Sequence, residues 1–135
     1  MPTILCDHNV EGQVAVLVSV WTSSEWLELW LAFGCAVETL ASLAIPESTL
    51  DSELWKLCQS RGIVLITANR NSEGEDSLEV TMRRLCQADS LPVVTIADAD
   101  RVMIDRGYAE KVAIQIFEVL LEIDRLRGTR RLFVP

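Results

Sequence analysis

Short apolar segments alternate with longer amphipathic segments along the chain, and this alternation predicts strands followed by helices. Four segments are apolar and short enough to be buried strands, at residues 3–6, 35–39, 63–67 and 92–97. The clearest is 63–67, which is apolar at successive positions, as is typical of the interior of a parallel sheet. Helical patterns cover residues 11–21, 25–33, 51–60, 76–88 and 108–126.

The order of these segments favours an α/β fold. No two predicted strands are joined by a tight hairpin turn, and every connection between them contains a helix. Connections of this kind give a mostly parallel sheet of about four strands with helices on both faces, a three-layer α/β/α sandwich. A length of 135 residues without internal repeats fits a single domain over residues 1–135.

Composition and charge mainly exclude classes of protein. Half of the residues are hydrophobic, which suits a folded core and argues against disorder. No apolar run reaches the roughly 18 residues of a membrane span, and the first residues lack a signal-peptide pattern, so we expect a cytoplasmic protein without membrane contact. A formal charge of −8 argues against general affinity for DNA or RNA, which requires a basic face. It leaves metal-dependent phosphodiesterases open, since these enzymes concentrate acids in their active sites.

Polar side chains follow the predicted strands at the edge where open parallel sheets bind their ligands. They are Asp7 and Asn9 after the first strand, Asp51 and Glu53 at the start of a helix, Thr67, Asn69 and Asn71 after the third strand, Glu75 and Asp76 in the following loop, and Asp98 and Asp100 after the fourth. Several carboxylates gathered at one edge repel one another unless a cation neutralises them. Mg²⁺ prefers such oxygen ligands and can activate a water against a phosphodiester.

Each acid also has a purely structural explanation. Asp51 and Asp76 fit helix N-caps, with Asp76 and Glu79 at capping-box spacing. Asp98 and Asp100 fit the turn after a strand. Asp7 is the hardest to explain in this way, because it ends an apolar strand at the edge where function usually lies. The chain has no Walker-type, Gly-x-Gly-x-x-Gly, Gly-x-Ser-x-Gly or His-Glu-x-x-His motif, which argues against P-loop enzymes, dinucleotide-dependent dehydrogenases and serine hydrolases.

Three motifs occur in a suggestive order. The chain begins with a strand ending in Asp-His-Asn at 7–9, continues with Asp51 and Glu53 before a helix, and then has a strand at 63–67 followed by Asn69-Arg-Asn71. Over roughly the first 100 residues, these motifs resemble the PIN-like family, relatives of the PIN-domain ribonucleases of toxin–antitoxin systems. Small members show Asp-x-Asn, an acidic pair, and a strand ending in Thr-x-Asp-x-Asp-Phe.

The resemblance implies an α/β/α sandwich with an acidic, Mg²⁺- or Mn²⁺-dependent site that cuts RNA. Transferred to this sequence, it makes Asp7 the first metal ligand and Asp51 the second acid, helped by Glu53. Asp98 corresponds to a late acid, so the expected catalytic residues are Asp7, Asp51 and Asp98.

The chain departs from the family pattern at the third motif. Asn69 and Asn71 stand where the pattern has two aspartates. An amide oxygen can ligate a hard cation but brings no charge, so metal affinity and activation of water are both weakened. Glu73, Glu75 or Asp76 in the following loop can replace the missing acids, and we expect Asp76 as the third metal ligand.

Two functions therefore stay open, with a third less favoured. The first is a metal-dependent endoribonuclease. The second is a non-catalytic PIN-like binding module, either a homodimer or a complex with an antitoxin-like protein, formed through the helix at 25–33. Its Trp26 and Trp30 share one face and pack in the core or against a partner. A receiver-like signalling domain would need a phosphorylatable aspartate at the end of a central strand, where this chain has Thr67.

Overall fold

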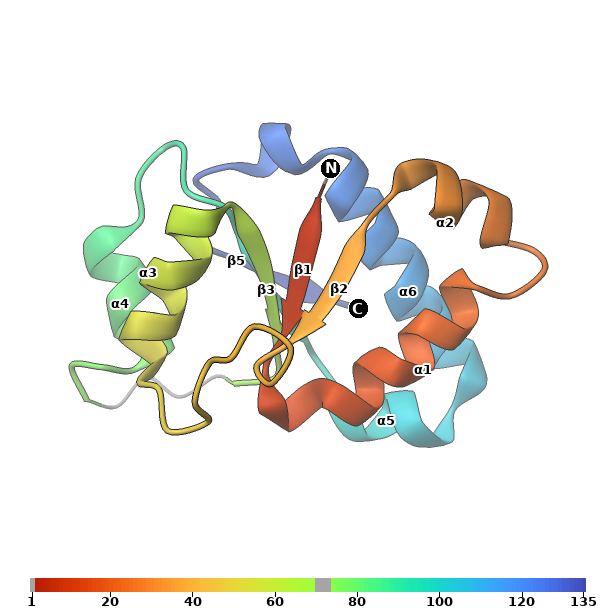
Figure 1. The fold of residues 1–135 in the computed structure, drawn as a ribbon, viewed down its shortest axis with the longest axis horizontal. Coiled ribbons are helices and arrows are strands. Elements are labelled where there is room, and N and C mark those ends of the chain that lie inside the picture. The colour runs from red at the N-terminus through yellow and green to blue at the C-terminus, as the bar shows by residue number, and fades with distance from the viewer. Residues whose placement is uncertain (1, 70–73) are drawn as a thin grey trace.

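A computed structural model describes residues 2–69 and 74–135. Over these residues, five strands form one sheet in the order β2-β1-β3-β4-β5, and every neighbouring pair is parallel (Figure 1). The strands are β1 (Thr3–Cys6), β2 (Ala36–Thr39), β3 (Ile63–Thr67), β4 (Val93–Ile96) and β5 (Arg131–Val134). The predicted α/β/α sandwich with a parallel sheet is confirmed, with one strand more than expected.

Helices cover both faces of this sheet (Figure 1). They are α1 (Glu11–Trp21), α2 (Leu27–Phe33), α3 (Asp51–Arg61), α4 (Leu78–Leu85), α5 (Ala99–Ile104) and α6 (Arg106–Leu121), with 3₁₀ turns η1 (His8–Val10) and η2 (Ile123–Leu126). One face packs against α3 and α4, and the other against α1, α2, α5 and α6. Among the described residues, none of these helices combines the length and the apolar character that crossing a membrane requires.

The two hydrophobic cores follow from the alternation of side chains along the strands. In β3, Val64 and Ile66 pack towards α1 and α6, whereas Ile63 and Leu65 pack towards α3 and α4. All five residues of β3 are buried, as the apolar run predicts for an interior strand. On the α1 face, Trp21 and Trp30 stack with ring centroids 4.5 Å apart, so Trp30 is a core residue.

Three elements near the end of the chain differ from the prediction. The short β5 was not predicted, because it begins in an arginine-rich stretch that has the composition of a basic tail. The segment after β4 forms α5, and the long helix begins at Arg106, two residues earlier than expected, and ends at Leu121. Asp105 separates the two helices, because its carboxylate accepts a hydrogen bond from the Tyr108 backbone N–H and caps α6.

Candidate active site at the carboxyl edge of the sheet

The topology gives the sheet a switch point between β1 and β3. From β1 the chain passes to β2 on one side, and it then returns to β3 on the other side of β1. Open parallel sheets bind ligands beyond the carboxyl ends of their strands at such a point. Asp7 directly follows β1, and Thr67 ends the neighbouring β3. These two residues, both predicted from the sequence, therefore flank the switch point.

Asp7 is held in a fixed orientation. Asp7 is only 6% exposed, and both oxygens of its carboxylate accept hydrogen bonds. The Thr67 hydroxyl donates to Oδ2 at 2.9 Å, and the His8 backbone N–H donates to Oδ1 at 2.8 Å. The Nδ1 atom of the His8 ring lies 3.3 Å from the same Oδ1. A carboxylate this deeply buried is stable only when it is hydrogen-bonded or paired with a charge, and these contacts meet that need.

A chain of hydrogen bonds connects Asp7 to Asp51. The Thr67 hydroxyl accepts a hydrogen bond from the Asn69 backbone N–H at 3.0 Å, and the Asn69 side-chain amide donates to Asp51 Oδ2 at 2.7 Å. We call Asp7, Thr67, Asn69 and Asp51 the rim network. Asn69 serves in it as a donor, whereas an aspartate at this position would repel Asp51 in the absence of a cation.

The explanation of Asp51 and Asp76 as helix N-caps is wrong. The N-cap of α3 is Leu50, whose side chain makes no capping bond, and the N-cap of α4 is Ser77, whose hydroxyl accepts the capping hydrogen bond. Asp76 instead accepts a hydrogen bond from the Ser52 hydroxyl at 2.8 Å, and its carbonyl accepts one from the Ser52 backbone N–H at 3.2 Å. Asp76 therefore joins the loop before α4 to the first turn of α3.

A hollow of about 390 Å³ opens beside the rim network. Its lining consists of Thr49, Leu50, Asp51, Gly74, Glu75, Asp76 and Ser77. The structure thus brings Asp51, Glu75 and Asp76 to one cavity, with Asp7 connected to it through hydrogen bonds. Within residues 2–69 and 74–135, no three histidine, cysteine or acidic side chains are arranged to hold a metal ion by themselves.

The remaining predicted residues take no part in the rim network. Asp98 is the N-cap of α5 and accepts a hydrogen bond from the Arg101 backbone N–H at 3.2 Å, while Asp100 lies in the first turn of that helix. Asn9 lies in η1 and Glu53 in the first turn of α3. Across the described part of the chain, no hydrogen bond joins these four side chains to the network. Asn71 and Glu73 lie outside the described residues.

One residue that holds this edge together, Arg131, was missed by the sequence analysis. Its side chain is charged yet only 7% exposed, and it extends from β5. One guanidinium nitrogen donates to the Asn69 carbonyl at 2.7 Å and to the Thr95 hydroxyl at 2.6 Å. Nε and the other nitrogen donate to Glu79 at 3.1 and 2.9 Å. The apolar residues that follow it were the available signal that Arg131 belongs to a strand.

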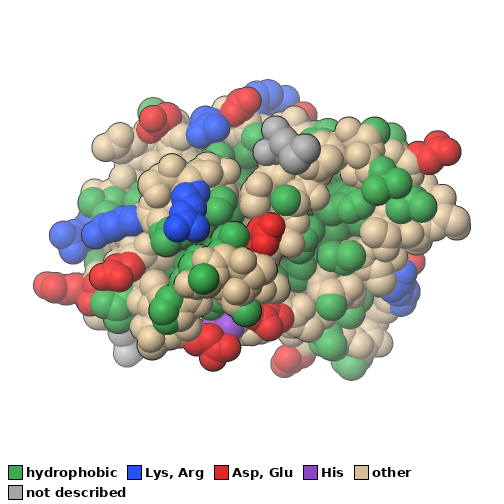
Figure 2. Space-filling view, in the orientation of Figure 1, with side chains coloured by type: hydrophobic (Ala, Val, Ile, Leu, Met, Phe, Trp, Pro, Cys, Tyr) green, Lys and Arg blue, Asp and Glu red, His purple; other side chains and the backbone are tan. Residues whose placement is uncertain are grey.

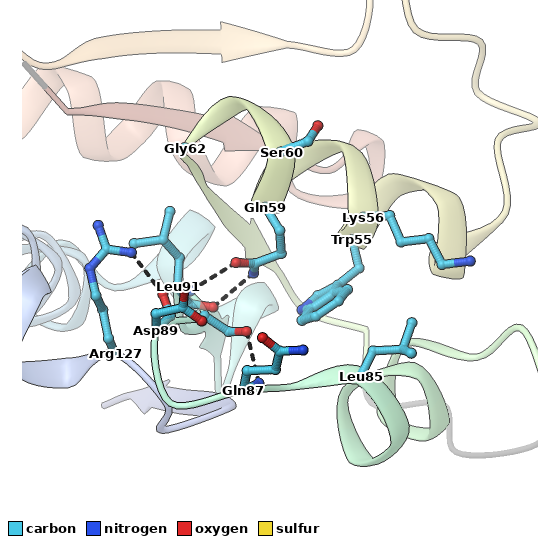
Figure 3. Close-up of a pocket in the computed structure, with 11 residues that line it drawn as sticks. Trp55, Lys56, Gln59, Ser60, Gly62, Leu85, Gln87, Asp89, Leu91 and Arg127 are labelled. Carbon is cyan, nitrogen blue, oxygen red and sulfur yellow. Dashed lines mark hydrogen bonds between the residues drawn. The ribbon is translucent and has the colours of Figure 1, made fainter.

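A hollow of about 440 Å³ lies at the opposite edge of the sheet (Figure 3). The polar groups in it already bind one another. Gln59 donates to the Leu91 carbonyl at 2.9 Å and accepts from the Leu91 backbone N–H at 2.8 Å, and Arg127 donates to the Asp89 carbonyl at 2.8 Å. These bonds tie the loop before β4 to α3 and to the segment after α6, which is a structural role.

Three cysteines, of which Cys6 and Cys58 are buried and Cys35 is half-buried, are poorly suited to nucleophilic chemistry. Burial raises the pKa of Cys58 to about 12, and it raises the pKa values of Cys6 and Cys35 to about 11. These thiols therefore stay protonated at neutral pH, and a protonated thiol is a weak nucleophile.

Comparisons with known proteins add no relative to this picture. No family model matches the chain, and neither curated proteins nor solved structures give a significant match. The function is therefore inferred from the geometry of the edge and from its motifs.

Proposed function

We propose that the protein is a Mg²⁺- or Mn²⁺-dependent endoribonuclease of the PIN-like type, with its site between the carboxyl ends of β1 and β3. The observation that carries the proposal is the rim network, which connects the carboxylates of Asp7 and Asp51 through Thr67 and Asn69. It lies at the switch point, where parallel sheets bind ligands. Carboxylate and amide oxygens are the ligands that Mg²⁺ prefers, and Mg²⁺ commonly takes one or two carboxylates and completes its shell with water.

The proposal draws on the oxygen donors of the edge, which are of the kind that a hard cation prefers. Asp7 and Asp51 would hold the ion, Asn69 would add a neutral oxygen, and Asp76 lies on the adjoining hollow. A bound divalent ion supplies Lewis acidity towards a phosphodiester and lowers the pKa of a coordinated water. The chain itself fixes the orientation of Asp7 through the Thr67 hydroxyl and through the backbone N–H that follows Asp7.

The charge of the edge supports a cation-dependent reaction. Asp7, Asp51, Glu75 and Asp76 are all acidic, and the guanidinium of Arg131 is buried beneath the edge and bound to Glu79. A polyanion such as RNA is repelled by this edge unless a cation neutralises it. We therefore expect the same ion to be required both for RNA binding and for cleavage.

Mn²⁺ binding and RNA cleavage test this proposal together. Calorimetry should show Mn²⁺ binding to the purified protein, and single-stranded RNA of mixed sequence should be cut when Mn²⁺ is present. Asp7→Asn and Asp51→Asn should lose both properties, whereas Asp89→Asn, at the opposite edge, should keep them. If the wild type neither binds Mn²⁺ nor cuts RNA, the proposal fails.

Binding without catalysis is the second candidate function. It is favoured by Asn69, which supplies no charge where a third acid would strengthen a metal site. A protein of this kind would keep the fold to present a surface to a partner. The two candidates separate in the same experiment, because a folded protein that does not cut RNA, whether or not it binds Mn²⁺, favours the second.

A further inference from the structure

Apart from Glu28, the surface helix α2 consists of apolar residues. Its sequence, Leu-Glu-Leu-Trp-Leu-Ala-Phe, contains a single charged residue. Trp30 faces the core, but Leu27, Leu29 and Leu31 remain 37%, 56% and 68% exposed. A helix that is hydrophobic on all sides is normally buried on all sides. Figure 2 shows hydrophobic side chains gathered over α2. Much of this helix is thus left uncovered by the described chain.

A groove of about 450 Å³ lies between α2 and α6, and its surface is almost entirely apolar. Rings of Trp26, Phe33 and Phe117 line it, with Trp26 and Phe33 packed 6.2 and 5.2 Å from Phe117. Leu29 and Leu121, which are 56% and 57% exposed, line it as well. Apolar pockets of this size with rigid aromatic linings are typical of sites that receive the anchoring side chains of a partner.

Acidic side chains on and next to the two helices of the groove favour a basic partner. Glu118 lines it, Glu28 is the charged residue of α2, and Glu25 precedes that helix. All three are exposed, and no ion pair is formed by them within the described residues. Two copies of this chain meeting through the groove would bring these like charges together, which is costly at an interface. A partner with lysine or arginine beside its apolar anchors would instead be attracted.

We propose that the groove between α2 and α6 binds an amphipathic helix of another protein, with its apolar face in the groove and basic residues against Glu28 and Glu118. Grooves between helices commonly receive amphipathic helices whose anchors recur at helical spacing. The length of α2, roughly 10 Å, matches about two turns of such a partner. The sequence predicted a homodimer or a partner complex through this helix, and the charge of the groove favours the partner complex.

The groove lies away from the rim network. Phe33 and Leu121 also line a second hollow together with Thr3 and Gly62, at the amino ends of β1 and β3. At the carboxyl ends of the same two strands, Asp7 follows β1 and Thr67 ends β3. A partner can therefore occupy the groove while the candidate active site stays open, so this inference is independent of the proposed nuclease activity.

Three synthetic peptides of about 14 residues provide the probes. The first has leucine at helical spacing with lysine on its polar face, the second replaces lysine by glutamate, and the third replaces leucine by serine. Fluorescence anisotropy should show binding of the first peptide only. Leu29→Glu and Leu121→Glu should weaken that binding about tenfold or more, as loss of a central anchor does. Ile104→Glu, which changes an exposed apolar residue on α5, should leave it unchanged.

A charge reversal keeps the test independent of the leucine variants. Glu118→Lys alters only an exposed charge and should weaken binding of the lysine peptide while strengthening that of the glutamate peptide. Light scattering should give the mass of one chain for the wild type. The proposal is overturned if the lysine peptide does not bind, if it binds no better than the other two, or if the wild type is a dimer that Leu29→Glu dissociates.

Discussion

The Thr67 hydroxyl donates a hydrogen bond of 2.9 Å to Asp7, across 60 residues of sequence, and both residues are buried. The same hydroxyl accepts the backbone N–H of Asn69. One side chain therefore satisfies a buried carboxylate and fixes the turn that brings Asn69 to Asp51. The alignment of β1 with β3 makes this contact possible, because Cys6 and Ile66 are paired immediately before it.

Thr67→Val should destabilise the protein by about 1–3 kcal/mol, because it leaves Oδ2 of Asp7 and the N–H of Asn69 without their partner at nearly constant side-chain volume. Urea unfolding measures the change. Thr81→Val is the control, since Thr81 is also buried but its hydroxyl only donates to the Ser77 carbonyl within α4. Equal losses of stability in the two variants would show that the hydrogen bond to Asp7 contributes no more than the one within α4.

Arg131→Met should destabilise the protein by roughly 2–4 kcal/mol, since it removes four hydrogen bonds and leaves Glu79 without its cation in a partly buried position. Arg130→Met should cost less than about 0.5 kcal/mol, as is usual for an exposed side chain. Urea unfolding of both variants gives the comparison. A similar stability for the two variants would contradict the role of Arg131 as an anchor of the loop after β3.

Trp30→Ala should cost about 3–5 kcal/mol, because it opens a cavity beside Trp21 in the core. Leu31→Ala, on the exposed face of the same helix, should change stability by less than about 0.5 kcal/mol. Thermal or urea unfolding distinguishes the two. If Leu31→Ala is as destabilising as Trp30→Ala, Leu31 packs against other residues of the same chain and this face of α2 is not exposed.

Asp105→Asn should remove part of the stability gained between acid and neutral pH. Hydrogen bonds from the Tyr108 N–H and then from Arg101 hold the pKa of Asp105 below its ordinary value. A carboxyl whose folded-state pKa is lowered stabilises the fold above its ordinary pKa, and this contribution is lost as the pH falls through the folded-state value. The melting temperatures of wild type and variant should therefore differ near neutral pH and converge in acid. If the difference in melting temperature does not change with pH, the lowered pKa of Asp105 does not contribute to stability.

Local pattern was sufficient for much of the fold. The strands at 3–6 and 63–67 and the helix at 11–21 were predicted with the bounds that the structure shows, because apolar runs and helical periodicity specify them directly. The fifth strand has a weaker local signal, only three apolar residues after Arg131, and the burial of Arg131 depends on partners distant in sequence. Asp98 looked like the end of a strand, but it also starts a helix by capping it.

The candidate site was predictable in its location but not in its contacts. Asp7 marks the carboxyl edge because a charged residue ends an apolar strand, and the position of Asp51 at the start of a helix follows from the pattern. The bond from Asn69 to Asp51 depends on how the loop after β3 turns, which the sequence does not specify. An asparagine that looked like the loss of an acid proves to be a hydrogen-bond donor between β3 and α3.

The position of Arg131 also bears on synthesis of the protein. The ribosome makes Asp7, Asp51 and Asn69 well before Arg131, which follows Asn69 by 62 residues. A nascent chain that has emerged as far as β4 holds the acids of the edge but not the cation that anchors the Asn69 carbonyl. The edge can take its final form only after β5 has docked beside β4, so any activity that depends on it begins only once β5 has been made.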